Sequence, residues 1–200
     1  RQYQRHRAPS GRMNMTLPAR IEGYAIVSED GMLANADGVM PEALKFEADQ
    51  RYFADGLDTF EAVIHGRHSH EQQPHSPLRH RITVTGGVEK ITPDPDNAKG
   101  ILWNPAVNTF EEAWAALGIA KASLGVVGGT SVFGMFLDRY DAFHLTRAPG
   151  VRLPGGRAVF PDVPRLTPEQ VMTQHGLRAG ARQTLDAARN LAVVVWRRHQ

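Results

Sequence analysis

Val126-Val127-Gly128-Gly129-Thr130-Ser131-Val132-Phe133 joins an apolar run, typical of a buried strand, to an apolar helical segment through two glycines. Glycines at such a junction let the backbone approach a ligand closely, and the start of the following helix favours an anionic phosphate. The stretch lacks the G-x-G-x-x-G fingerprint, and Gly-Gly before a helix is also ordinary turn chemistry. It therefore predicts a strand–turn–helix unit, with phosphate binding and a simple turn as alternatives.

A second stretch, Val63-Ile64-His65-Gly66-Arg67-His68-Ser69, repeats this arrangement, since a short apolar strand ends in glycine and enters a basic turn. Arg67 and His68 are suited to holding phosphate groups, and arginine is the better bidentate donor. The alternative is a solvated loop at a sheet edge. Two phosphate-friendly turns at the ends of two strands favour a nucleotide site more than either turn alone.

Outward from these stretches, strand-like and helix-like pieces alternate, which predicts a single α/β domain. We predict strands at residues 24–27, 62–64, 82–84, 101–103, 124–127 and 141–146, and a hairpin of 183–185 with 191–196. Helices are predicted at residues 41–55, for one turn at 68–72, after a Thr109 cap, at 132–137, and from Thr167 to a stop at Gly176. Loops are expected at residues 28–40, 93–97 and 149–161.

Composition narrows the classes of protein. The 200 residues are 42% hydrophobic, carry a formal net charge of +2 and include no cysteine, which fits a cytoplasmic protein without disulfides. Much of the positive excess precedes residue 22, so residues 1–19 are predicted to be a flexible basic leader and residues 20–200 the folded domain. The balanced body argues against a nucleic-acid binder, and no apolar run approaches the ~20 residues that cross a bilayer.

Several histidines crowd one region and raise the question of a metal site. They are His65, His68, His70, His75 and His80. His68 and His70 are two residues apart and would diverge on a helix, whereas zinc-binding helices place two histidines on one face. We therefore expect no metal site.

The order of short motifs along residues 21–197 resembles the dihydrofolate reductase superfamily, which includes the pyrimidine reductases of riboflavin biosynthesis. Five places carry the resemblance: Gly38-Val39-Met40-Pro41, Asp49 with Phe53, Gly66-Arg67-His68-Ser69, Gly128-Gly129-Thr130, and Thr146 followed by Phe160-Pro161. The resemblance implies a three-layer α/β/α domain. Its central sheet would be mixed but mostly parallel, with a C-terminal antiparallel hairpin.

The resemblance also implies site residues and a cofactor, NADPH. The implied cofactor-binding residues are Gly66, Arg67, His68, Ser69, Thr85, Val127, Gly128, Gly129, Thr130, Ser131 and Val132. Asp49 and Thr146 are the implied catalytic residues, and Ala25, Phe53 and Arg79 the implied substrate-binding residues. We prefer NADPH to NADH because Arg67 and His68 offer charge for the extra phosphate.

Asp49 is suited to the proton transfer that such a reductase requires. In such enzymes the nicotinamide supplies a hydride, and the protein must orient the acceptor and supply a proton. A carboxylate in an apolar pocket can do this because burial raises its pKa. Asp49 is flanked by Tyr52 and Phe53, although an exposed helix carboxylate is the ordinary alternative.

Departures from the resemblance fall on the substrate pocket. Glu42 stands where folate reductases usually carry Trp, and Ser28-Glu29-Asp30-Gly31 resembles the Ser-x-Asp-Gly of the pyrimidine reductases. Three hypotheses follow: a reductase of a C=N bond in a pterin-like substrate, a reductase of a ribosylated pyrimidine phosphate, and a dinucleotide-binding module without catalysis. Residues 191–196 are expected to form a core strand or, at an exposed edge, to pair subunits into a homodimer.

Overall fold

A computed structural model describes residues 16–69, 71–120 and 122–199; most of the predicted leader, residues 1–15, therefore lies outside the described residues. The strands of the main sheet are β1 (Arg20–Val27), β3 (Ala62–Gly66), β4 (His80–Val84), β5 (Thr92–Pro93), β6 (Gly100–Trp103), β7 (Ser123–Gly128), β8 (Ala142–Arg147), β10 (Leu177–Asp186) and β11 (Leu191–Arg198). A second, two-stranded sheet pairs β2 (Met32–Ala34) with β9 (Arg157–Ala158).

The main sheet has the strand order β10-β11-β8-β1-β7-β3-β4-β6-β5. The six strands from β8 to β6 are parallel to one another, whereas β11 is antiparallel to β8, and β5 is antiparallel to β6. The predicted mostly parallel sheet with a C-terminal hairpin is therefore confirmed. Because parallel strands end at one edge, the turns after β1, β3, β7 and β8 lie close together.

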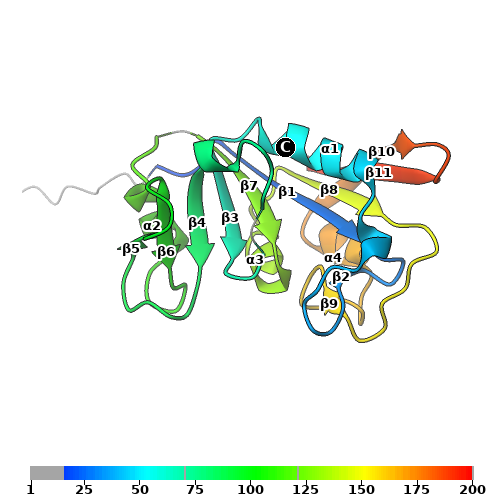
Figure 1. Cartoon of the computed structure of the whole chain (residues 1–200), viewed down its shortest axis with the longest axis horizontal. Coiled ribbons are helices and arrows are strands. Elements are labelled where there is room, and N and C mark those ends of the chain that lie inside the picture. The colour runs from blue at the N-terminus through cyan, green and yellow to red at the C-terminus, as the bar shows by residue number, and fades with distance from the viewer. Residues whose placement is uncertain (1–15, 70, 121, 200) are drawn as a thin grey trace, which may run out of the picture.

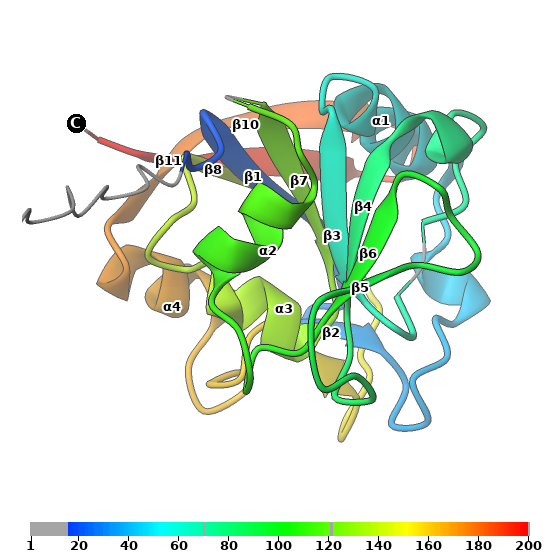
Figure 2. The ribbon, with the colours of Figure 1, turned by 90° about the vertical axis from the view of Figure 1, so that its left-hand side faces the viewer.

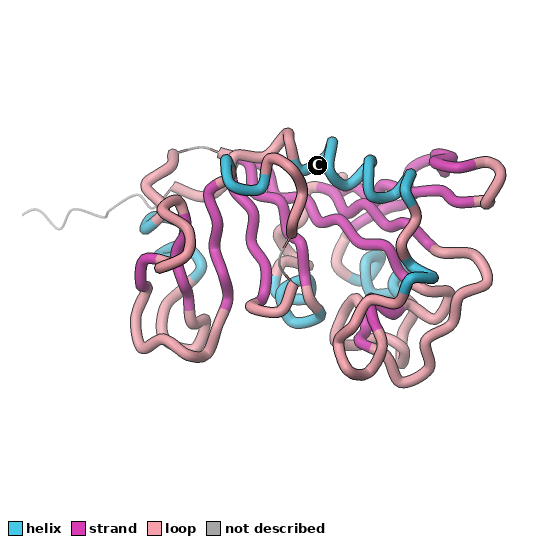
Figure 3. The backbone as a smooth tube through the Cα atoms, in the orientation of Figure 1, coloured by secondary structure: helices cyan, strands magenta, loops and turns pink. Residues whose placement is uncertain are grey.

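Helices cover both faces of this sheet (Figures 1 and 2). The helix α1 (Glu47–Leu57) lies on one face, and α2 (Phe110–Ala116), α3 (Thr130–Met135) and α4 (Pro168–Gln174) lie on the other. The tube in Figure 3 shows that long loops, including most of residues 148–167, join these elements. This is the predicted three-layer α/β/α arrangement.

The period of two along the strands divides the core into two sides. On β7, Leu124 and Val126 join the large cluster beneath α2 and α3, while Val127 faces the smaller cluster beneath α1. Aromatic residues dominate the smaller cluster, with Tyr24 and Phe60 buried and Tyr52 and Phe53 partly buried. No helix among the described residues is long and apolar enough to span a membrane.

Helix α1 approaches the sheet closely at Gly56. A β carbon at this position would lie 2.5 Å from Cε1 of the Tyr24 ring, which is closer than real β carbons come to their neighbours. Glycine is disfavoured within a helix because of its backbone entropy, so its presence here is explained by contact rather than by propensity. The contact brings the α1 side chains down onto β1 and β8.

The structure corrects several predicted boundaries. The predicted helix at residues 41–55 is interrupted, because a short 3-10 turn at Glu42–Leu44 is followed by non-helical backbone at Lys45 and Phe46 before α1 begins. The described residues of 68–72 form no helical turn, and the side chain of Glu71 is drawn into an ion pair with Arg81 instead. The loops predicted at 28–40 and 149–161 contain β2 and β9.

Other local predictions are confirmed. Thr109 and Thr167 cap α2 and α4, and Thr167 forms a reciprocal pair of bonds with Gln170. The predicted hairpin is longer than expected, with Gln183 opposite Val193. However, β11 lies between β10 and β8, so residues 191–196 do not form an exposed edge, and the basis for expecting a homodimer through them is removed.

Substituting Gly56 tests the helix–sheet contact. Gly56→Ala is expected to lower the free energy of unfolding by about 1–3 kcal/mol, because overpacking against Tyr24 exceeds the helix propensity gained. The measurement is denaturant unfolding. Gly86→Ala, where a β carbon would meet open space, is the control and should change stability by less than about 0.5 kcal/mol. Equal effects of the two substitutions would contradict the close contact.

Candidate functional site

A cavity of about 350 Å³ opens at the carboxyl ends of β1, β7 and β8, beneath α1. Such a crevice at the strand ends of an α/β sheet is where ligands ordinarily bind. The lining residues are Tyr24, Ala25, Ile26, Leu33, Ala34, Gly38, Met40, Asp49, Gln50, Tyr52, Phe53, His68, Ser69, Gln73, Val127, Gly129, Phe133, His144 and Thr146. The cavity thus brings together predicted residues from five segments of the chain.

Asp49 is the carboxylate of this cavity. It lies in the first turn of α1, and the hydroxyl of Thr146, on β8, hydrogen-bonds to it. Burial raises the pKa of Asp49 to about 6, and the Thr146 hydrogen bond opposes this rise only in part. Asp49 is therefore suited to holding a proton near neutral pH, which is the role that the resemblance implies for it.

The diglycine turn forms a second wall. Gly128 has a φ of +112°, and a β carbon there would lie 2.7 Å from Phe133, so only glycine fits the backbone and the space. The peptide bond between Gly128 and Gly129 is cis. Gly129 borders the cavity and precedes α3, so its backbone is open to a ligand.

The two glycine turns predicted from sequence meet in space. A β carbon on Gly66 would lie 3.9 Å from the backbone nitrogen of Gly129, and one on Gly129 would lie 3.3 Å from Oγ of Ser69. Arg67 and His68 are exposed beside this junction, and Ser69 donates its backbone N–H to Gly66. The junction thus combines glycine backbone with exposed basic side chains, a donor set that fits the phosphates of a dinucleotide.

The remaining predicted cofactor residues lie around these turns. Val127 borders the cavity, Val132 is buried against Gly66, and Ser131 is exposed. Thr130 donates its hydroxyl to the carbonyl of Ala158, which ties the turn to β9. Thr85 follows β4 and accepts the N–H of Gly87, outside the set of cavity-lining residues.

Arg79 is not brought to the cavity. Its side chain is 4% exposed and is bound by the carbonyl of Leu57 and the carboxylates of Asp58 and Glu71. It precedes β4, at the opposite edge of the sheet from the glycine turns. The two carboxylates neutralise its charge, so its place in the structure is that of a buried ion pair rather than a substrate ligand. The other predicted substrate residues, Ala25 and Phe53, line the cavity.

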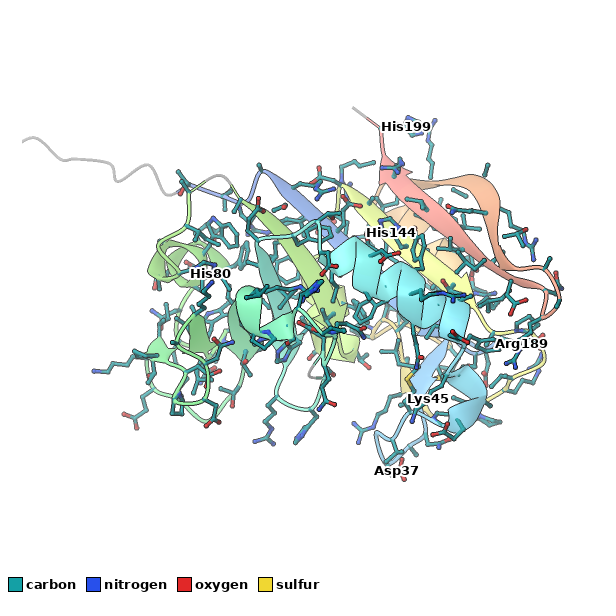
Figure 4. The ribbon with its side chains drawn as sticks, turned by 45° about the horizontal axis from the view of Figure 1, so that its top comes forward. Asp37, Lys45, His80, His144, Arg189 and His199 are labelled. Carbon is teal, nitrogen blue, oxygen red and sulfur yellow. The ribbon has the colours of Figure 1, made fainter. Side chains whose placement is uncertain are left out.

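A group of polar residues in the cavity wall was not predicted. Tyr52 lies 2.5 Å from Nδ1 of His144, whose Nε2 lies 2.7 Å from Glu22. The rings of Tyr24 and His144 stack in parallel with centroids 4.0 Å apart. Figure 4 shows His144 beside α1. The sequence spacing could have indicated Tyr52 and His144. Tyr52 lies about one helical turn after Asp49, and His144 lies two residues before Thr146 on β8, so each shares a face with a predicted site residue.

Burial and charge set the ionisation of this group. Although burial raises the pKa of Glu22, the hydrogen bond and charge of His144 outweigh it, so the pKa of Glu22 lies below its ordinary value. Burial and the charge of Glu22 raise the pKa of Tyr52. Glu22 is therefore a carboxylate and Tyr52 a neutral phenol over the physiological range.

Other parts of the structure are less suited to be the functional site. A cavity of about 440 Å³ lies between β8, β10, β11 and α4, with the ion pair of Arg147 and Glu169 at its wall, but it contains no predicted site residue. Within the described ranges, no three or more His, Cys, Asp or Glu side chains gather as a metal site would require.

Comparison with solved structures identifies proteins that have a similar fold. Dihydrofolate reductase from Enterococcus faecalis, complexed with NADP(H) and RAB-propyl, superposes with a TM-score of 0.60 at 16% identity over 91% of this chain and 98% of that one. The chain has a dihydrofolate reductase-like fold. Neither protein-family models nor curated sequences match it, so the likeness is one of structure.

Two further solved structures share the same fold. One, described as a riboflavin biosynthesis protein from Shewanella sp. PV-4, has a TM-score of 0.64 at 16% identity over 90% of this chain and 99% of that chain. The other is a diaminohydroxyphosphoribosylaminopyrimidine deaminase/5-amino-6-(5-phosphoribosylamino)uracil reductase from Thermotoga maritima, with a TM-score of 0.66 at 14% identity. This chain is covered to 91% but spans only 57% of the Thermotoga chain.

The raised pKa of Asp49 predicts a pH-dependent effect on stability. A carboxyl group whose pKa is higher in the folded state destabilises the fold once ionised, so the penalty is absent below pH 4 and complete above about pH 6. Asp49→Asn should therefore raise the free energy of unfolding by about 2–3 kcal/mol at pH 8 and leave it unchanged at pH 3.5. Urea unfolding at both pH values measures this effect. Asp55→Asn, at an exposed position of α1, is the control, and an equal gain at both pH values would contradict the burial of Asp49.

Proposed function

We propose that the chain is an NADPH-dependent reductase that transfers a hydride to a C=N bond of a pterin-like heterocycle. The observation that carries this proposal is that one cavity is bordered both by the junction of the two glycine turns and by the half-buried carboxylate of Asp49. A reductase of this kind needs groups that anchor the cofactor and a proton donor that reaches the acceptor, both at one cavity. The dihydrofolate reductase-like fold supports the proposal, since its solved neighbour from Enterococcus is a reductase complexed with NADP(H).

Different residues around the cavity would bind the cofactor, hold the proton and flank the substrate. Glycine backbone at positions 66, 128 and 129 would hold the phosphates, while Arg67 and His68 would recognise the additional phosphate of NADPH. Bound NADPH supplies the hydride. Asp49 would hold a proton against the ring nitrogen of the acceptor, and the Thr146 hydroxyl would fix the carboxylate in place. The aromatic rings of Phe53 and Tyr24 would flank a flat substrate and exclude water.

Reduction of a ribosylated pyrimidine phosphate is the second candidate. It is favoured by Ser28-Glu29-Asp30-Gly31, which resembles the Ser-x-Asp-Gly of the pyrimidine reductases, and the solved neighbour from Thermotoga is a deaminase/reductase that acts on such compounds. A catalytically silent dinucleotide-binding module would bind cofactor without reducing either class of acceptor. Assays with a dihydropterin and with a ribosylated aminopyrimidine phosphate separate these functions.

Cofactor titration tests the phosphate site. NADPH added to the purified chain should enhance nicotinamide fluorescence, with NADPH bound at least about tenfold more tightly than NADH. Arg67→Ala should weaken NADPH binding by about 10–100-fold and leave NADH binding unchanged, because a charge-assisted phosphate contact is lost. Arg51→Ala, at an exposed position of α1, is the matched control. Equal affinity for the two cofactors, or absence of binding at millimolar cofactor, would contradict the site.

Single-turnover hydride transfer tests Asp49. Asp49→Asn should slow the reaction by about 10²–10⁴-fold without changing NADPH affinity, since a positioned proton donor contributes an acceleration of this order. Because Asp49 acts in its protonated form, the wild-type rate should fall as pH rises above about 6, and this dependence should disappear in Asp49→Asn. Glu47→Gln, which changes an exposed carboxylate in the same helical turn, should behave as wild type. An unaltered pH profile in Asp49→Asn would show that another group supplies the proton.

A further inference from the structure

A second cavity, of about 440 Å³, lies on the face of the sheet opposite the cavity that contains Asp49. Strand β8 contributes to both, because alternate residues of a strand point to opposite faces. His144 and Thr146 line the Asp49 cavity. Leu145 and Arg147, which alternate with them, line the second one, together with residues of β10, β11 and α4 (Figure 1). Its volume falls within the roughly 300–1,000 Å³ of small-molecule sites, and the proposed function gives it no role.

The floor of this second cavity is an apolar part of the sheet. Val194 on β11 lies opposite Leu145 on β8, and both line the cavity. Trp196, two residues further along the same face of β11, lies opposite Ala179 on the edge strand β10. Ala192 continues the floor in the other direction. A surface of aliphatic side chains beside an indole ring favours a flat apolar ligand body.

A β-bulge in β10 turns Arg182 toward this floor. Arg182 is opposite Val194, three residues after Ala179, whereas the partners of these two residues on β11 are only two residues apart. In a regular strand, residues three apart point to opposite faces, but the extra residue of the bulge places Ala179 and Arg182 on the same face. Gly180 lies in the bulge, where a β carbon would be 2.9 Å from a carbonyl oxygen of β11. Bulges often redirect a side chain beside a functional site.

Among the described residues that line this cavity, Arg182 is the one charged side chain without a partner of opposite charge. Glu169 is ion-paired with Arg147 at 2.5 Å, and Glu29 is paired with an arginine outside the wall. Nη2 of Arg182 donates instead to the carbonyl and side-chain oxygens of Asn190, which hold the guanidinium in place across the hairpin. A positioned guanidinium is a strong donor to a carboxylate, so the charge of this cavity is complementary to an anion.

We propose that this second cavity is a binding site for a small aromatic carboxylate, whose ring lies on Val194 and Trp196 and whose carboxylate binds Arg182. The site is separate from the proposed reductase site, and its existence does not depend on that function. The two cavities differ in charge, because the described lining of the first includes the carboxylate of Asp49 and no lysine or arginine. An aromatic anion is therefore expected to prefer the second cavity.

Calorimetric titration with a matched pair of probes tests the proposal. The probes are 2-naphthoate and its neutral amide, 2-naphthamide, which has the same ring. The wild-type chain should bind 2-naphthoate at least about tenfold more tightly, because the amide loses the charge-assisted bond to Arg182. Equal affinity for the two probes, or no binding of 2-naphthoate at millimolar concentration, overturns the proposal. The titration needs neither cofactor nor turnover, so failure of the proposed function would leave its result unaffected.

Two further measurements locate the bound probe. In ¹H–¹⁵N spectra, 2-naphthoate should shift the indole N–H signal of Trp196 and leave those of Trp103 and Trp114, which are buried elsewhere, unchanged. Saturating NADPH should not change the affinity for 2-naphthoate, because the two cavities lie on opposite faces of the sheet. Competition with NADPH, or shifts confined to the other two tryptophans, would assign the probe to another site and overturn the proposal.

Variants separate the charge of the cavity from its shape. Arg182→Gln should remove the preference for 2-naphthoate and leave 2-naphthamide binding unchanged. Arg178→Gln is the matched control, because Arg178 is an exposed arginine of the same strand, opposite Arg197 on the other face of the sheet. A preference retained in Arg182→Gln overturns the assignment.

Ala179→Trp tests whether the groove itself holds the probe. Ala179 is exposed, so a larger side chain can fill the cavity without overpacking the core, and denaturant unfolding should show the fold intact. The binding of both probes should fall by at least about tenfold. Undiminished binding overturns the proposal. Sedimentation of the wild type and the variant covers the other possible occupant, since a dimer that dissociates in Ala179→Trp would assign the groove to a second copy of the chain and overturn the proposal as well.

Discussion

Helix α1 touches the sheet where Gly56 lies against the ring of Tyr24, and this contact leaves no room for a β carbon. The approach sets the height of the whole helix above β1 and β8. At that height the Thr146 hydroxyl reaches Asp49, and the phenol of Tyr52 reaches His144. A helix held further from the sheet would separate these pairs and admit water between them. The ionisation of Asp49 and Tyr52 in this cavity therefore depends on the steric contact between Gly56 and the ring of Tyr24.

The sheet separates the part of the molecule that stabilises it from the part that meets ligands. On β8, Phe143 and Leu145 pack into the large core beneath α3 and α4, while His144 and Thr146 face α1. Apolar burial on the first side supplies most of the folding free energy. The second side can then tolerate a carboxylate whose ionisation is unfavourable, which is a common arrangement at sites that carry out acid–base chemistry.

Features with a local cause could be predicted from the sequence. The glycine turns follow from apolar strands that end in glycine. Asp49 was singled out by the resemblance, because its aromatic neighbours alone left both a buried and an exposed carboxylate open. The contact of His144 with Glu22 could not be predicted, because it depends on β1 and β8 being neighbours in the correct register. The position of Arg79 away from the cavity could not be predicted either, because its charge partners, Asp58 and Glu71, come from other segments of the chain. The break before α1 likewise arises from non-helical backbone at Lys45 and Phe46 that helical periodicity does not reveal.

The position of β1 in the sheet has a consequence for how the chain is made. This strand lies between β8 and β7, and its partners come late in the sequence, since Ile21 pairs with Leu124 and Glu22 with Ala142. On the ribosome an apolar strand therefore emerges long before anything can pair with it, whereas β3, β4 and β6 are consecutive neighbours and can associate earlier. A nascent chain that stops before β8 holds Asp49 without Thr146 and Glu22 without His144. The cavity consequently cannot form until synthesis has passed Thr146 on β8.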